Sequence, residues 1–69
     1  MNQDLPEYVQ RLIKERDEAQ ERRIKLAAFT ESPAFEDISI RQQFLLNKQR
    51  AVMADYVFIL NQRIEDLTK

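Results

Sequence analysis

The tetrapeptide Thr30-Glu31-Ser32-Pro33 is the strongest interruption in this sequence of 69 residues, because the chain has no glycine and its other proline is Pro6. Proline disfavours the helical conformation at the residue before it, so a helix arriving from the N-terminal side is expected to end before Pro33. We therefore predict that the chain reverses direction here, and that the two flanking segments form the two arms of a hairpin.

The segment before this break has the composition of one long helix. From Leu5 to Phe29 it is rich in Glu, Arg, Lys, Leu and Ala, and no residue after Pro6 breaks helices. Proline is tolerated in the first helical turn, and Glu7 places a negative charge near the positive end of the helix dipole. We predict the first helix over residues 5–29.

The segment after the break is predicted to form one short helical turn, over residues 34–38, and then a second long helix. Ser39 and Gln42 have the Ser-x-x-Gln spacing of a capping box, which places the second helix over Ile40–Leu67. Two long helices joined by a loop of about ten residues favour antiparallel packing. The predicted fold is an all-α, antiparallel two-helix hairpin that forms a single domain over residues 1–69.

The first helix carries one interrupted apolar stripe, which consists of Leu5, Val9, Leu12, Ala19 and Leu26, with Ile13, Ile24 and Ala27 beside it. Continuing the same spacing places Arg16 and Arg23 in the stripe. Our preferred interpretation is that these arginines extend to the edge of the hairpin, where their charges remain hydrated. The alternative is a polar seam with a functional role.

The second helix is apolar around most of its circumference. One face groups Leu45, Val52, Tyr56, Ile59, Arg63 and Leu67, and it is widened by Leu46, Met53, Val57, Leu60 and Ile64. A nearly opposite face groups Ile40, Phe44, Ala51 and Phe58. The first helix can cover one of these sides only, so we predict that the other side packs against another chain in a homo-oligomer.

The short length supports the same prediction. The chain has neither cysteine nor histidine, so disulfides and the usual zinc ligands cannot stabilise it. A single apolar core in so short a chain typically supplies only about 3–5 kcal/mol, and oligomerisation is a common remedy.

The charge balance restricts the class of partner. With 11 Lys and Arg against 12 Asp and Glu, the net charge is −1, which argues against attraction to long nucleic acids or to an anionic membrane surface. No apolar run approaches the length of a membrane span, and the start Met-Asn-Gln-Asp has no secretory signal pattern. We expect a soluble, cytoplasmic protein with no membrane partner.

Missing residue types exclude most enzyme templates. Without Cys, His and Gly there is no nucleophilic triad, no phosphate-binding glycine loop and no dinucleotide fingerprint, so no cofactor and no metal are expected. The carboxylates Asp17, Glu18 and Glu21 lie among basic residues at spacings that predict ion pairs on a solvated face. We therefore predict that the protein is not an enzyme.

Recognition of rings and anions remains open. Tyr8 and Arg11 lie three residues apart on one helical face, and Arg23 and Lys25 belong to a basic cluster further along the helix. Lys25 lies about 26 Å from Tyr8 along one helix, but two antiparallel copies would bring these two residues together. The alternative interpretation is that the cations stabilise the helix dipole and that the hydroxyls of Thr30 and Ser32 cap the turn.

Several segments together resemble a known family: residues 5–12 (Leu-Pro-Glu-Tyr-Val-Gln-Arg-Leu), 25–29 (Lys-Leu-Ala-Ala-Phe), 53–56 and 59–64 (Ile-Leu-Asn-Gln-Arg-Ile). The chain resembles small phage-encoded helical-hairpin proteins, whose best-known members are anti-CBASS sponges. The resemblance implies a hexamer that sequesters cyclic oligonucleotide signals of bacterial immunity, in the host cytoplasm, without cleaving them.

The same resemblance implies two kinds of ligand site. A pocket for cyclic dinucleotides between chains would use an aromatic residue and a lysine, for which Tyr8 and Lys25 are the matching types, with Arg11 and Arg23 as further candidates. A second pocket near the turn, for cyclic trinucleotides, would use Ala28, Thr30 and Arg63. The rival hypothesis is a structural or protein-interaction hairpin, in which the surplus apolar face docks on a host or phage protein.

Overall fold

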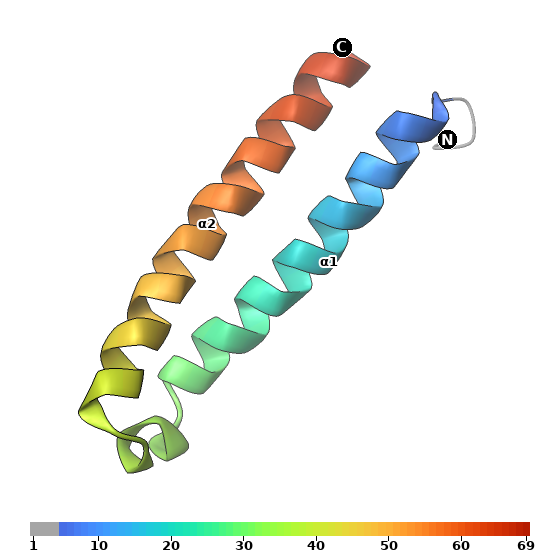
Figure 1. Cartoon of the computed structure of the whole chain (residues 1–69). Coiled ribbons are helices and arrows are strands. Elements are labelled where there is room, and N and C mark those ends of the chain that lie inside the picture. The colour runs from blue at the N-terminus through green and yellow to red at the C-terminus, as the bar shows by residue number, and fades with distance from the viewer. Residues whose placement is uncertain (1–4) are drawn as a thin grey trace.

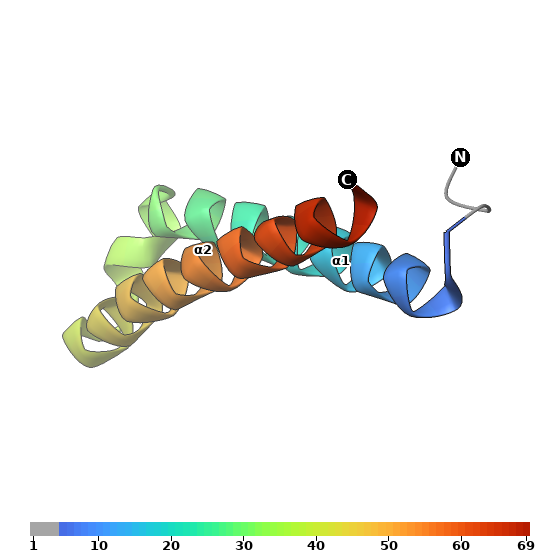
Figure 2. The ribbon, with the colours of Figure 1, turned by 90° about the horizontal axis from the view of Figure 1, so that it is seen from above.

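The computed structural model describes residues 5–69, and these residues form a two-helix hairpin (Figure 1). The elements are helix α1 (Glu7–Thr30), the short 3-10 helix η2 (Pro33–Asp37) and helix α2 (Ile40–Thr68). The helices run antiparallel, and they cross at a shallow angle when seen from above (Figure 2). The longest extent of the molecule is 47 Å. The predicted all-α hairpin with a helical turn between its arms is confirmed.

Helix α1 begins two residues later than predicted. Pro6 has φ −54° and ψ 151°, so it precedes the first helical residue, and its carbonyl accepts hydrogen bonds from the backbone N–H groups of Val9 and Gln10 at 3.0 and 3.1 Å. An N-cap residue normally has a non-helical conformation of this kind. Proline therefore caps this helix from outside its first turn.

The chain leaves α1 where the sequence predicts. Ser32 is extended, with φ −90° and ψ 158°, as expected for a residue before proline. The rings of Phe29 and Phe35 meet edge to face with centroids 6.2 Å apart, which packs η2 against the end of α1. The Ser39 hydroxyl then accepts a hydrogen bond from the backbone N–H of Gln42 at 3.1 Å, so the predicted cap of the second helix is confirmed.

The core is a narrow seam between the two helices. Val9, Leu12 and Ala19 of α1 and Val57 and Leu60 of α2 are buried. All of them except Val9 form one cluster, and half-buried Ile64 packs against it. The predicted stripe of the first helix therefore faces the second helix.

The arginines of this stripe turn toward the edge of the hairpin. The Arg16 guanidinium donates hydrogen bonds to Asp17 at 2.8 Å and to Asn61 of α2 at 2.7 Å. Arg23 donates to Gln20 at 3.0 Å. These contacts favour the first interpretation, in which the arginine stems pack at the edge of the hairpin. They do not favour the alternative of a polar seam with a functional role.

Helix α2 meets α1 through the flank of the first predicted face rather than through its centre. The contact uses Val57 and Leu60, flanked by half-buried Met53 and Ile64, and the sequence assigns all four to the residues that widen the face of Leu45, Val52 and Tyr56. The residues expected at its centre are exposed, and Val52 is 62% exposed. A helix that is apolar nearly all round does not identify its inner side by composition, and the three-four spacing of the buried residues decides it here.

The opposite face of α2 is exposed as well. Ile40, Phe44 and Phe58 are 78%, 55% and 62% exposed, and Ala51 is also exposed. The Lys48 ammonium lies 5.6 Å from the centre of the Phe44 ring and covers part of it. The sequence indicates that one of the two apolar faces of α2 is uncovered, whereas residues of both faces are exposed in the structure, because α1 covers only the narrow seam.

Within residues 5–69, neither helix is both long and apolar enough to cross a membrane.

Candidate functional site

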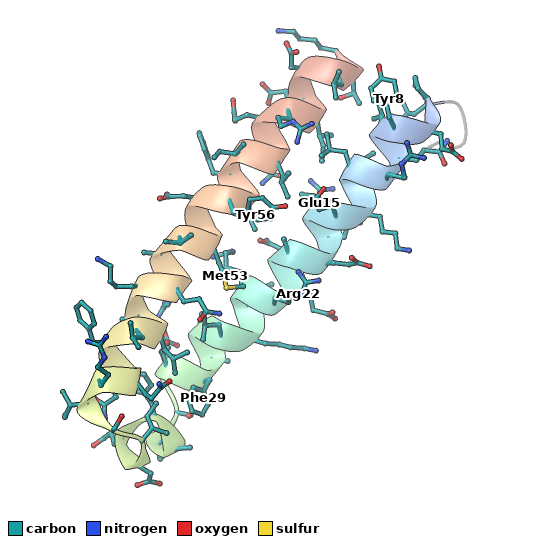
Figure 3. The ribbon with its side chains drawn as sticks, viewed as in Figure 1. Tyr8, Glu15, Arg22, Phe29, Met53 and Tyr56 are labelled. Carbon is teal, nitrogen blue, oxygen red and sulfur yellow. The ribbon has the colours of Figure 1, made fainter. Side chains whose placement is uncertain are left out.

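A cleft of about 370 Å³ opens at the end of the hairpin away from the turn. It is lined by Tyr8, Arg11, Leu12 and Glu15 of α1 and by Arg63 of α2. Arg11 and Leu12 follow Tyr8 by three and four positions and Glu15 follows it by seven, so the four residues lie on one side of the helix, where Leu12 is buried. Figure 3 places Tyr8 at this open end, with Glu15 further down the same helix.

Arg63 reaches the cleft because the core fixes the rotation of α2. Leu60, three residues before it, is almost completely buried, and Ile64 packs on the core cluster. Arg63 lies next to them on the helix but at the edge of the seam, where its side chain is exposed. The register of the two helices thus brings Arg63 of α2 to the cleft that Tyr8 of α1 also lines.

Both arginines of the cleft are accessible to an anion. Arg11 pairs with Glu7 at 3.0 Å, but both side chains are exposed, and exposed pairs of this kind contribute little free energy. None of the ion pairs within residues 5–69 involves Arg63. A ligand phosphate can therefore bind either guanidinium with little loss of free energy from broken ion pairs.

A hydrogen bond between the helices holds the side chain of Glu15, the acidic residue of the cleft. The Tyr56 hydroxyl of α2 donates to a carboxylate oxygen of Glu15, and the two side chains point toward each other in Figure 3. The sequence does not predict this contact, because Tyr56 falls among the apolar residues of one face of the second helix and nothing pairs it with an acidic residue of the first.

The structure brings three of the predicted site residues together and leaves the others elsewhere. Tyr8, Arg11 and Arg63 line one cleft. Lys25 is exposed further along α1, about 26 Å from Tyr8 by the helical rise. The expectation that one chain cannot unite Tyr8 with Lys25 therefore holds. Arg23 is half-buried in the seam and bonded to Gln20, so it is less accessible than Lys25.

The residues predicted for the second pocket are divided between the two ends of the hairpin. Thr30 lies at the turn, where its hydroxyl donates to the Ala27 carbonyl at 2.8 Å, and Ala28 is exposed nearby. Arg63 belongs to the cleft at the far end. A single chain therefore does not group Arg63 with Ala28 and Thr30, because the helices are antiparallel.

The arginine that does reach the turn is Arg50. Its guanidinium donates to the Thr30 hydroxyl at 2.8 Å and to the Glu31 carboxylate at 3.2 Å. The Ser32 hydroxyl donates to the Phe29 carbonyl at 2.7 Å. Thr30 and Ser32 thus make the capping contacts of the alternative interpretation, and sequence reasoning missed Arg50.

The three clustered carboxylates of α1 lie on a solvated face, as predicted, but without the predicted ion pairs at three- and four-residue spacing. Asp17, Glu18 and Glu21 are all exposed, and among them only Asp17 forms an ion pair, with its neighbour Arg16 at 2.8 Å. Exposed charges gain little from such pairing, which explains the missing pairs at three- and four-residue spacing. No group of three or more acidic residues in the described part of the chain is placed to hold a metal ion.

Comparison with protein-family models identifies the family. The sequestin model matches residues 6–66, which include both helices and the turn. The chain belongs to the sequestin family. The match confirms the resemblance noted in the sequence, and the name denotes sequestration, which is a binding role rather than a catalytic one. Searches of the curated proteins and of the solved structures gave no significant match.

Proposed function

We propose that this sequestin binds cyclic oligonucleotide signals of bacterial immunity and holds them without cleaving them. The observation that carries the proposal is the cleft that Tyr8, Arg11 and Arg63 line together. An aromatic ring stacks a nucleotide base, and guanidinium groups bind phosphates through paired hydrogen bonds. Every cyclic oligonucleotide contains both bases and phosphates.

The dimensions of the cleft support a site that more than one chain completes. A volume of about 370 Å³ lies at the lower end of the range for small-molecule pockets. The cleft is also open to solvent, so one chain encloses only part of a ligand. In an antiparallel pair of copies, Lys25 of one chain would approach the cleft of the other and supply a further phosphate contact.

The exposed apolar surface of α2 supports the assembly that such a site needs. Phe44, Phe58 and Ile40 are all more than half exposed, and soluble monomers rarely tolerate large apolar patches. We propose a homo-oligomer, and the family resemblance favours a hexamer. In that assembly a second pocket for cyclic trinucleotides would join Ala28 and Thr30 near the turn with Arg63 of a different chain.

The biological role follows from binding without turnover. A phage protein of this kind would act in the host cytoplasm, and it would lower the free concentration of a CBASS signal in proportion to the number of its sites. Cleavage is not proposed, because the sequence supplies no histidine or cysteine for acid–base or nucleophilic chemistry.

The exposed apolar faces also favour one alternative function, which is docking on a host or phage protein. Calorimetric titration with cyclic di- and trinucleotides separates the two proposals. Saturable binding, with the ligand recovered intact by chromatography after denaturation, supports the sponge. Absence of binding across the panel favours the docking hairpin, and recovery of cleaved products would contradict a non-enzymatic role.

A further inference from the structure

We infer that Glu15 reads the base held in the cleft and selects guanine. This inference rests on the proposed binding of cyclic oligonucleotides and adds the base preference of that site. Its starting point is the presence of a carboxylate in a cleft whose other charged residues, Arg11 and Arg63, are positive. An ionised carboxylate repels phosphate, so its favourable contact with a ligand must be with hydrogen-bond donors.

Glu15 is held in place for this contact. The Tyr56 hydroxyl donates to one carboxylate oxygen, Oε2, across the helix interface. Within residues 5–69, no hydrogen bond or ion pair uses the other oxygen, Oε1. Each carboxylate oxygen has two lone pairs, so beside the bond from Tyr56 Glu15 can still accept a hydrogen bond at Oε2 as well as at Oε1.

The spacing between Tyr8 and Glu15 leaves room for a base in the cleft between them. The two residues are seven positions apart on α1, which corresponds to about 10.5 Å along the helix axis. Leu12 lies between them and provides an apolar floor. A base that stacks on the Tyr8 ring and extends over Leu12 can reach Glu15 with its hydrogen-bonding edge, while Arg11 and Arg63 remain for the phosphates.

Only guanine offers the donor pattern that a carboxylate needs. Its N1–H and N2–H groups are adjacent donors and match the two oxygens of a carboxylate. Adenine and cytosine each present a single amino donor beside a ring nitrogen acceptor, and that lone pair would face the negative charge. Uracil presents one N–H between two carbonyl oxygens. The same carboxylate therefore attracts guanine and disfavours the other bases, which is how one group produces specificity.

Tyr56 acts on the base as a positioning residue. Its hydroxyl touches Glu15 and does not line the cleft. Removing the hydroxyl leaves the carboxylate free to rotate, so the preference for guanine should weaken without the loss of stacking or of phosphate contacts.

The test compares cyclic di-GMP with cyclic di-AMP by calorimetry, for the full chain and for Glu15→Gln. Wild type should bind cyclic di-GMP about tenfold more tightly or better, because hydrogen bonds to a charged acceptor are strong. Glutamine still accepts a bond from Tyr56, but its amide also donates, which suits the edge of adenine. The affinity ratio should therefore fall toward one in Glu15→Gln, and part of the way in Tyr56→Phe.

Glu18→Gln is the matched control, since Glu18 is exposed on the same helix and does not line the cleft. This variant should keep the wild-type ratio, and circular dichroism should give the same helix content for all proteins. Equal affinity of wild type for both ligands, or an unchanged ratio in Glu15→Gln, would overturn the assignment of Glu15 and leave the sponge proposal standing. No binding of either ligand or of a cyclic trinucleotide would instead contradict the sponge proposal itself.

Discussion

Tyr8 of α1 and Arg63 of α2 come from opposite ends of the sequence and line the same cleft at the open end of the hairpin. The antiparallel topology brings their helical segments together, and burial of the neighbouring residues Val9 and Leu60 fixes which way each helix faces. An aromatic ring and a cation on opposite helices form a cleft that is accessible to a ligand in solution.

Replacement of Tyr8 tests the role of the ring. Tyr8→Ala should remove base stacking worth about 1–3 kcal/mol, which corresponds to roughly fivefold to a hundredfold weaker binding of a cyclic dinucleotide. Tyr8→Phe keeps the ring and should retain most of the affinity. Both are measured by calorimetry. Equal affinities for Tyr8→Ala and wild type would show that the ring is not part of the site.

Arg63→Ala tests the contribution of α2 to the same cleft. Loss of a charge-assisted phosphate contact of about 1.5–3 kcal/mol should weaken binding about tenfold or more. The dependence of affinity on salt should also decrease, because one fewer cation meets the phosphates. Arg41→Ala is the control, since Arg41 is exposed at the start of α2, near the turn. Matching losses in both variants would point to a general effect of charge.

Lys25 tests whether each site is shared between chains. Lys25→Ala should weaken binding about as much as Arg63→Ala, although Lys25 lies far from the cleft of its own chain. When Tyr8→Ala and Lys25→Ala chains are refolded together, some high-affinity sites should return. A site formed by Tyr8 of a Lys25→Ala chain and Lys25 of a Tyr8→Ala chain keeps both wild-type residues. Mixtures that bind no better than the separate variants would contradict a shared site.

The exposed apolar face of α2 predicts the assembly surface. Phe58→Asp or Phe44→Asp should dissociate the oligomer, because burial of an unpaired carboxylate is strongly unfavourable. Analytical ultracentrifugation of wild type and both variants measures this. Gln62→Asp is the control, since Gln62 is an exposed polar residue of the same helix. A folded wild-type monomer at micromolar concentration, or intact assembly in both phenylalanine variants, would rule out this face as the interface.

The backbone of the hairpin was largely predictable from sequence, because its signals are local. Pro33 and Ser39 mark the end of one helix and the start of the next, and both act through their immediate neighbours. The start of α1 was misplaced by two residues, since proline is compatible with the N-cap as well as with the first turn.

The candidate site was predictable only in part, because it depends on how two helices are rotated against each other. Tyr8 and Arg11 were paired by their spacing on one helix. The approach of Arg63 and the contact between Tyr56 and Glu15 depend on which side of α2 is buried, and an almost uniformly apolar helix does not specify that side.

Titration followed by recovery of the ligand tests the central claim most directly. The protein is saturated with a cyclic dinucleotide, the stoichiometry is measured by calorimetry, and the complex is denatured and analysed by chromatography. A sponge should bind a fixed number of ligands per chain and release them unchanged, however long the incubation. No saturable binding of any cyclic di- or trinucleotide, or release of linear products, would contradict sequestration by this sequestin.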